Sequence, residues 1–266
     1  AETYGVLAYN ANLPMFKKDL SKSKINFLTP KASLRYAPGH MRDIGDDNLR
    51  LNYSNLFTLN KNSQIDVIEN GSSLAVGLEF SSLDFENNKT GDENYSLYLG
   101  QVYNFEENLD MPSRSSLDQK VSDLVGKASV KFSENFSLKN EFSVDQNFND
   151  INYNDFKASF LLGNAKFNIG YLEENNHIGN NSYFKSDIKL EINESNNLSF
   201  DLKKNLETDS TEFYNLSYNY INDCLKAGLV YRREFYKDRD VESSDTLLFN
   251  ISLFPFGNVS LPTVDR

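Results

Sequence analysis

The chain has 266 residues, a formal net charge of −11 at pH 7, and 20 Phe and 15 Tyr residues but no Trp. The negative charge argues against a nucleic-acid partner, because neutralising phosphates requires clustered Lys and Arg. No run approaches the roughly 18 to 20 consecutive apolar residues of a membrane helix, which excludes a helical membrane protein. The first residues lack the basic segment and apolar core of a signal peptide, so they are interpreted as mature sequence or as part of an internal fragment.

Apolar and polar residues alternate along most of the chain, whereas helical spacing is not sustained over about three turns. The pattern predicts an all-β protein of about thirteen strands, each close to the ~9 to 11 residues of a tilted transmembrane strand. The predicted strands are 4–12, 25–37, 73–83, 95–105, 124–132, 136–145, 153–162, 165–172, 183–192, 198–204, 212–221, 224–235 and 246–256.

The two faces of the predicted strands differ in polarity. In 183–192, Phe184 and Ile188 lie on one face and Lys185 and Asp187 on the other, because successive strand side chains point to opposite sides. A β-sandwich also has one apolar face per strand, so alternation alone favours a barrel only weakly. The length and number of the predicted strands favour a transmembrane barrel over a sandwich, since strands of globular proteins average about 5 to 6 residues.

The connections between predicted strands alternate in length through the second half of the chain. Short turns lie at 133–135, 163–164, 193–197 and 222–223, and longer polar loops lie at 146–152, 173–181, 205–211 and 236–245. Outer-membrane barrels have short periplasmic turns and long extracellular loops. The same parity places two long segments, 38–71 and 106–123, outside the membrane, where a loop of this length is functional or disordered.

The last predicted strand combines an apolar face with a terminal aromatic residue. Thr246, Leu247, Phe249, Ile251, Leu253, Pro255 and Phe256 are its residues of interest, and the alternate positions Asn250 and Ser252 are polar. An amphipathic strand that ends the chain near an aromatic is typical of an outer-membrane barrel.

Several short motifs then occur in a fixed order: LTPKASLRYAPGHMRD from Leu28, SNLFTLNKNSQIDVIENG, LGQVYNF, SSLDQKVSDLVG and DCLKAGLVYRREF. Together they resemble the barrel region of the LptD (OstA) family of outer-membrane lipopolysaccharide-assembly proteins, over about Leu28 to Phe256. The matching positions are Pro30, Arg35, Tyr36, Pro38, Gly39, Leu56, Phe57, Asn60, Asp66, Glu69, Gly71, Gly100, Gln101, Ser122, Asp123, Val125 and Gly126. Lys61 and Gln64 depart from the family pattern, which often has Arg and Gly there.

The resemblance implies a barrel of about 26 strands behind a periplasmic jelly roll. Residues 1–266 then form the C-terminal portion of one outer-membrane barrel domain, without the jelly roll and the first half of the barrel. An odd strand count agrees, because complete bacterial barrels are even-numbered. The implied partners are lipopolysaccharide, an LptE-like lipoprotein plug, an LptA-like periplasmic bridge that meets the missing N-terminal domain, and the barrel-insertion machinery. The implied location is the outer membrane of a Gram-negative bacterium.

The resemblance also implies roles for two sites. Cys224 lies in a predicted periplasmic turn and matches a cysteine that family members pair with one in the N-terminal periplasmic region; the alternative is an inert thiol. Strand 246–256 matches the strand that closes the barrel and forms its lateral gate. Pro255 has no amide donor and would weaken that seam, although it also serves simply to end the strand.

No catalytic, metal-binding or cofactor-binding constellation is recognisable. His40 and His177 lie far apart in the sequence, with no further ligand at metal-binding spacing. The lysines on polar strand faces are expected to be lumen charges, with contact to lipid phosphates as the alternative; they are Lys185, Lys189, Lys203 and Lys226. We therefore expect a transporter of lipopolysaccharide and no enzyme. The rival hypotheses are a passive porin-like barrel, an outer-membrane enzyme and a soluble all-β binding protein.

Overall fold

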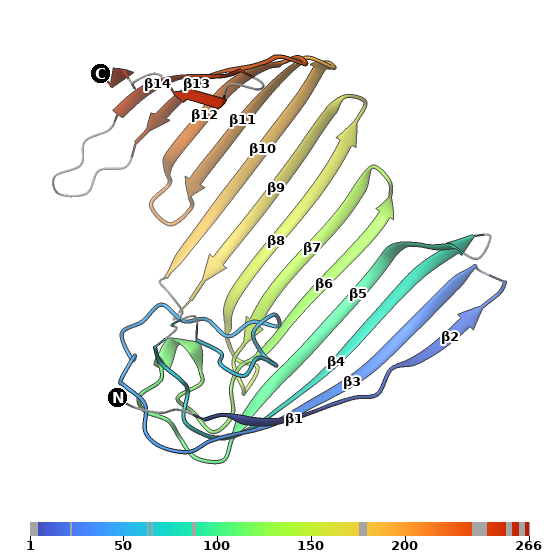
Figure 1. Cartoon of the computed structure of the whole chain (residues 1–266), viewed down its shortest axis with the longest axis vertical. Coiled ribbons are helices and arrows are strands. Elements are labelled where there is room, and N and C mark those ends of the chain that lie inside the picture. The colour runs from blue at the N-terminus through green and yellow to red at the C-terminus, as the bar shows by residue number, and fades with distance from the viewer. Residues whose placement is uncertain are drawn as a thin grey trace. The chain divides into compact units, whose positions relative to one another are not determined.

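The computed structural model describes residues 5–21, 23–62, 64, 66–86, 89–175, 180–235, 244–253, 257–260 and 264–265. Its strands follow one another with few other elements (Figure 1). They are β1 Leu7–Asn12, β2 Met15–Asp19, β3 Lys24–Ala37, β4 Gly71–Glu86, β5 Lys89–Asn104, β6 Leu124–Ser133, β7 Phe136–Val144, β8 Ile151–Leu162, β9 Ala165–Glu174, β10 Asn181–Asn193, β11 Asn196–Asn205, β12 Ser210–Ile221, β13 Leu225–Glu234, β14 Ser244–Leu253, β15 Gly257–Ser260 and β16 Val264–Asp265. One 3-10 turn, η1, spans Ser113–Ser115.

The predicted all-β, antiparallel architecture is confirmed, and each of the thirteen predicted strands corresponds to one of β1 and β3–β14. Three short strands were missed. The first predicted strand begins later than expected, and after Leu13 and Pro14 the chain resumes pairing as β2. Proline lacks an amide donor and interrupts the ladder there, which is why one edge divides into two strands. The last predicted strand is described as far as Leu253, in β14, and the further strands β15 and β16 were not predicted.

The strands pair in nearly their chain order, β1-β3-β4 and so on to β14-β15, while β2 pairs with β3 and β16 with β14. The pairs β3-β4, β4-β5, β10-β11, β12-β13 and β13-β14 are all antiparallel. Among the described residues no pairing joins β1 to β14 or β15, so this strand order is not closed. The sequence-predicted short turns are present, and at Gly163 a positive φ of 57° suits glycine.

Strand register aligns the apolar faces of neighbouring strands. Leu229 of β13 lies opposite Tyr218 of β12 and Phe249 of β14, and Tyr231 lies opposite Leu216 and Leu247. These side chains stay open to the surroundings: Leu216, Leu229 and Leu253 each keep 43% of their surface exposed. The apolar face of these strands is therefore not covered by other parts of the described chain. Among the described residues, no helix is long and apolar enough to cross a membrane.

The chain divides into two compact units. One comprises residues 1–132, 139–155 and 173–180, and the other comprises 133–138, 156–172 and 181–266. The first holds two long loops, 38–70 and 105–123, and a cluster of buried apolar side chains. The second consists of strands and turns with one apolar and one polar face, so its side chains form little enclosed core.

Candidate functional site: a loop folded on the polar face of the first unit

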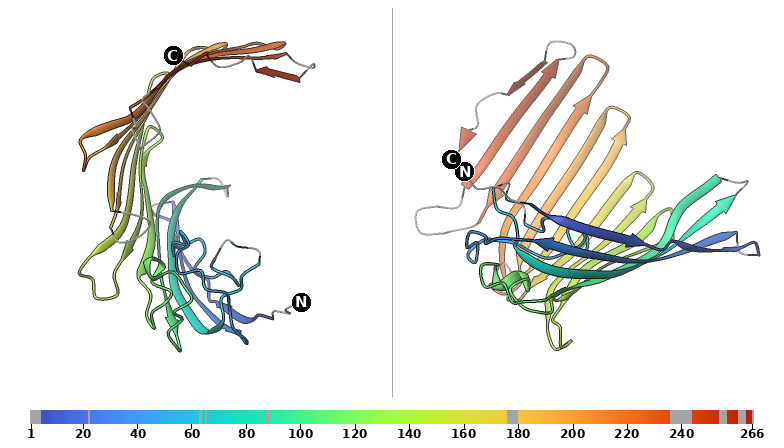
Figure 2. Two further views of the ribbon diagram at one scale, coloured as in Figure 1. Left: turned by 90° about the vertical axis from the view of Figure 1, so that its left-hand side faces the viewer. Right: turned by 60° about the horizontal axis from the view of Figure 1, so that its bottom comes forward.

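The two long loops gather at the same end of β3, β4 and β5 (Figure 2). Together with the adjoining strands they enclose the main apolar cluster of the first unit. Its buried members are Met41, Ile44, Leu49, Leu51, Leu56, Val67, Ala75, Val102, Met111, Leu117 and Val125. Because apolar burial stabilises each such side chain by about 1.5 to 3 kcal/mol, these loops are folded structures with a core of their own.

Two glycines form a seat for the first loop. Gly77 of β4 and Gly100 of β5 are register partners. A Cβ at Gly100 would lie 2.1 Å from Leu56 Cδ2, and a Cβ at Gly77 would lie 2.7 Å from Phe57 Cζ. Only glycine leaves room for this loop to touch the strands. The motif residues Leu56, Phe57 and Gly100 thus belong to one contact, which their separation in the sequence conceals.

A buried ion pair fastens the far end of the same loop. Lys61 Nζ lies 3.2 Å from both carboxylate oxygens of Glu69, and the two side chains keep only 2% and 4% of their surface exposed. Burial lowers the pKa of Lys61, and the carboxylate of Glu69 opposes that effect. Arg35 Nε donates to Leu59 O at 2.6 Å, and Arg35 Nη2 donates to Glu69 O. Lys61, where the family often has Arg, keeps the cation that this geometry requires.

The side-chain amide of Asn60 binds the backbone near Glu69 and so holds the two ends of the segment 60–69 together. Its Nδ2 donates to Val67 O at 2.8 Å and its Oδ1 accepts from Glu69 N at 3.2 Å. Asp66, by contrast, forms an exposed ion pair of 3.1 Å with Arg42. The structure therefore brings Asn60 and Glu69 into one hydrogen-bonded turn and leaves Asp66 at its surface.

Three other motif positions mark where the loop leaves and rejoins the strands. Pro38 directly follows β3, Gly39 has φ of 106°, and Gly71 begins β4 with φ of 89°. Residues with side chains rarely adopt such positive φ values. The glycines are thus required by the backbone geometry at the ends of the loop.

The second loop is anchored by the Ser122 and Asp123 motif. Ser122 Oγ accepts from Val102 N at 2.9 Å and donates to Asp123 O at 2.9 Å. The Asp123 carboxylate accepts from Ser143 Oγ and Asn152 Nδ2, each at 2.8 Å. Burial raises the pKa of Asp123, while these hydrogen bonds oppose the rise.

Gly126 serves a different contact from the rest of its motif. A Cβ there would lie 2.4 Å from Phe142 Cζ and 2.8 Å from Leu99 Cδ2. Leu99 is the register partner of Gly126, so this contact lies on the apolar face of the strands. The motif therefore holds the loop with Ser122 and Asp123 and packs the opposite face with Gly126.

Sequence reasoning missed the contacts that hold the tip of the first loop on the strands. Tyr53 donates from its hydroxyl to Glu79 Oε1 at 3.0 Å, and Lys31 Nζ lies 2.5 Å from the same oxygen. Arg50 places its guanidinium carbon 3.6 Å from the centre of the Tyr153 ring, a cation–π contact. A glycine inside each of two neighbouring predicted strands, Gly77 and Gly100, was the available signal that a loop packs there. No feature of the sequence pattern indicated the role of Arg50.

The closing strand is only partly described. Thr246, Leu247, Phe249, Ile251 and Leu253 lie in β14, whereas Pro255 and Phe256 fall outside the described residues. The edge of β14 away from β13 pairs with β15 at 250–253 and with β16 at 246–247. The lateral-gate role of this strand stays a prediction.

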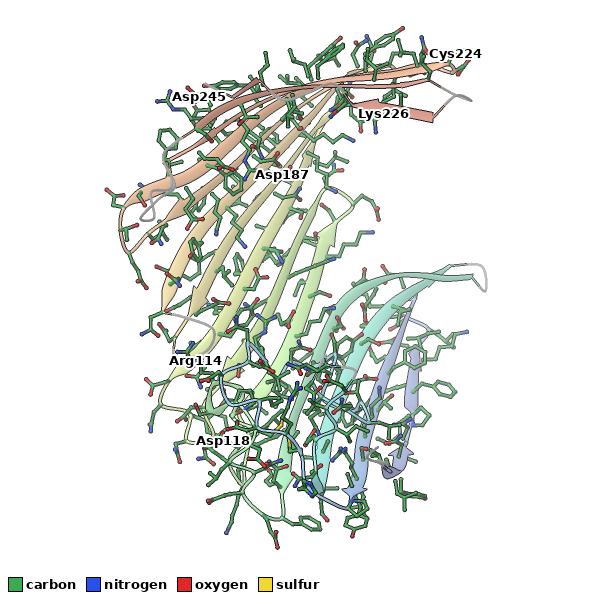
Figure 3. The ribbon with its side chains drawn as sticks, turned by 60° about the vertical axis from the view of Figure 1, so that its left-hand side comes forward. Arg114, Asp118, Asp187, Cys224, Lys226 and Asp245 are labelled. Atoms are coloured by element: carbon green, nitrogen blue, oxygen red, sulfur yellow. The ribbon has the colours of Figure 1, made fainter. Side chains whose placement is uncertain are left out.

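Cys224 lies in the turn between β12 and β13, with Lys226 close by on β13 (Figure 3). Its thiol is free and exposed. Asn222 Oδ1 accepts from Cys224 N at 3.0 Å and from Leu225 N at 2.7 Å, which explains the tight turn.

His40 is exposed in the first long loop, and His177 is outside the described residues. Within the described ranges, no group of three or more potential metal ligands forms.

Comparisons with solved structures find variants of the porin of Rhodopseudomonas blastica. A double mutant is 9% identical with a TM-score of 0.42, covering 98% of this chain and 89% of the porin. A triple mutant is 8% identical with a TM-score of 0.35, covering 99% and 98%. These likenesses are too low to carry an argument. No curated protein matches the chain.

A family model described as "LptD: LPS transport system D" matches residues 7–205. This range includes all of the matching motif positions, from Pro30 to Gly126. The chain belongs to the LptD family.

Proposed function

We propose that this protein moves lipopolysaccharide through the outer membrane of a Gram-negative bacterium into the outer leaflet, as part of a translocon with an LptE-like lipoprotein. The family match over residues 7–205 carries this proposal. The function requires no covalent chemistry. An LptA-like bridge would deliver the substrate through a preceding periplasmic domain, and the barrel-insertion machinery would place the protein in the membrane.

The two faces of the strands suit such a substrate. One face carries exposed leucines such as Leu216 and Leu229, and the other carries polar pairs such as Ser199 with Ser217, whose hydroxyls lie 2.5 Å apart. A polar lumen accepts the saccharide while the acyl chains leave toward lipid, so that each part of the substrate stays in a matching solvent. The strands described here would supply the C-terminal part of the barrel, and a preceding half would pair with the open edge at β1.

Depletion of the protein in the living cell tests this function. Lipopolysaccharide is expected to accumulate at the inner membrane and in the periplasm, and its surface display is expected to fall. Unchanged surface lipopolysaccharide would reject the proposal. Ion conductance of the purified protein that is unaffected by lipopolysaccharide, together with normal surface lipopolysaccharide after depletion, would favour the passive porin-like alternative.

A further inference from the structure

Two lysines flank a glycine on the polar face of β8 to β10 in the second unit, and a third lysine lies beside them on β11. Lys185 of β10 and Lys203 of β11 are direct register partners. A Cβ at Gly170 of β9 would lie 3.7 Å from Lys185 Cβ and 3.9 Å from Lys157 Cγ. Lys157 and Lys185 thus flank Gly170, where no side chain rises from the strand. We name the residues Lys157, Gly170, Lys185 and Lys203 the lysine row.

The charges in this region are arranged with like facing like. Two residues beyond the lysine pair, Asp187 and Asp201 are also direct partners. Like charges directly opposite each other destabilise a sheet, and an alternating arrangement would have avoided both pairs. The ion pair of Lys203 with Glu212 offsets part of the repulsion between the lysines, and a negatively charged ligand at Lys185 would offset the rest.

The neighbouring acidic groups leave Lys185 available. Lys203 Nζ is already engaged by Glu212 at 2.6 Å and lies 3.9 Å from the centre of the Tyr183 ring. Asp187 accepts a hydrogen bond of 2.5 Å from Asn168, and Asp201 lies beyond it on β11. Within the part of the chain that the structure describes, Lys185 makes no ion pair, and it is exposed.

We propose that the lysine row binds a phosphate group carried by the saccharide of the transported lipid. Ammonium groups are compact cations that recognise phosphate through charge-assisted hydrogen bonds. The missing side chain at Gly170 gives that anion room between Lys157 and Lys185. The inference rests on the proposed transport function and adds the chemical group that the polar face recognises.

The test uses the full-length protein with its partner lipoprotein, reconstituted in lipid vesicles, and measures delivery of two substrates. One is lipopolysaccharide and the other is lipopolysaccharide treated with phosphatase. Lys185→Gln removes the available cation. Gly170→Glu leaves all three lysines and fills the gap with a tethered carboxylate. The matched control is Lys189→Gln, which alters a lysine on the same face, outside the lysine row, that pairs with Glu191 at 3.3 Å.

Lys185→Gln and Gly170→Glu are both expected to reduce delivery of phosphorylated lipopolysaccharide, whereas the control Lys189→Gln behaves like the wild type and Lys185→Arg restores delivery. With the phosphatase-treated substrate, the difference between Lys185→Gln and the wild type is expected to disappear. Equal delivery by Lys185→Gln, Gly170→Glu and Lys189→Gln would reject phosphate binding by the lysine row. Inhibition by inorganic phosphate, with no preference between the two lipids, would make free phosphate the ligand and overturn the lipid assignment. Failure of the wild type to deliver any lipopolysaccharide would instead reject the proposed function.

Discussion

Lys61 and Glu69 form an ion pair whose partners have lost almost all contact with solvent. Moving two charges out of water is costly, so such a pair contributes little net stability compared with a well-packed apolar pair. Removing only one of the two charged side chains is strongly destabilising, because the remaining buried charge then has no partner. In this loop the pair selects one conformation, in which Arg35 also binds the backbone at Leu59 and Glu69.

Lys61→Met is expected to destabilise the first loop by about 3 to 5 kcal/mol, because the carboxylate of Glu69 stays buried without its cation. The double variant Lys61→Met/Glu69→Leu should recover most of that loss. Hydrogen exchange of the backbone amides at 60–70, in the detergent-solubilised protein, measures the free energy of loop opening. Lys189→Met is the control, since its pair with Glu191 is exposed and contributes less than about 1 kcal/mol. A double variant as unstable as Lys61→Met alone would contradict this account.

The carboxyl group of Asp123 gives the second loop a pH dependence. Its pKa in the folded loop is raised above the ordinary 3.8 by burial, so the protonated form is relatively favoured there. The corresponding stability is fully present below pH 3.8 and is lost as the pH rises through the raised pKa. Exchange of the Ser122 amide, corrected for its intrinsic rate, should therefore report easier opening at neutral than at acidic pH. Asp123→Asn should flatten this dependence and the exposed Asp66→Asn should not; a slope that survives in Asp123→Asn would rule out this carboxyl as its source.

At the scale of elements, the first loop and the strands under it form one packing unit. Leu56 fits against Gly100, Tyr53 binds Glu79, and Arg50 covers the ring of Tyr153. The loop thus touches β4, β5 and β8 within the first unit. A loop fastened at several strands holds their spacing, and it covers part of the polar face that would otherwise be open.

Gly100→Val should displace Leu56, since even a Cβ would lie 2.1 Å from Leu56 Cδ2 and 2.9 Å from Val76 O. Overpacking of this kind costs about 1 to 3 kcal/mol. We expect faster protease cleavage within 38–70 in the folded protein. Adding Leu56→Ala should not restore full protection, because the contact with the Val76 carbonyl remains. Gly170→Ala, whose Cβ meets nothing closer than 3.6 Å, is the matched control. Equal cleavage of the two variants would contradict the close packing of the first loop against Gly100.

In the whole molecule, the strand order of the described residues is not closed, and one face of the strands is apolar and exposed. Lipid tolerates neither an unpaired strand edge nor a polar backbone group without a partner. We therefore expect neighbouring strands to pair with the edge of β1, as proposed above, before the apolar face meets lipid. The thiol of Cys224 is free and exposed, and its disulfide bond with a cysteine elsewhere in the protein stays a prediction.

Leu229→Lys tests which face meets lipid. A lysine on the lipid-facing side at the membrane midplane costs about 2 to 4 kcal/mol, whereas a lysine toward the lumen costs far less. We expect the full-length protein with Leu229→Lys to fold less stably into lipid vesicles, as measured by urea titration. Ser217→Lys, on the neighbouring strand and opposite face, should behave nearly like the wild type. Equal losses for the two variants would show that the faces are assigned wrongly.

The strands and their faces can be predicted from the residues alone, because the two-residue period of a strand is a local property that each segment carries in its own residues. The residues alone also indicate the family, through motifs such as those at Arg35, Glu69 and Asp123. The folded structure was needed to show that Lys61 meets Glu69 inside a core, that Leu56 packs against Gly100, and that Lys185 faces Lys203. Those contacts depend on which strands pair and in what register, and the alternation of polar and apolar residues is the same for every even-numbered shift of that register.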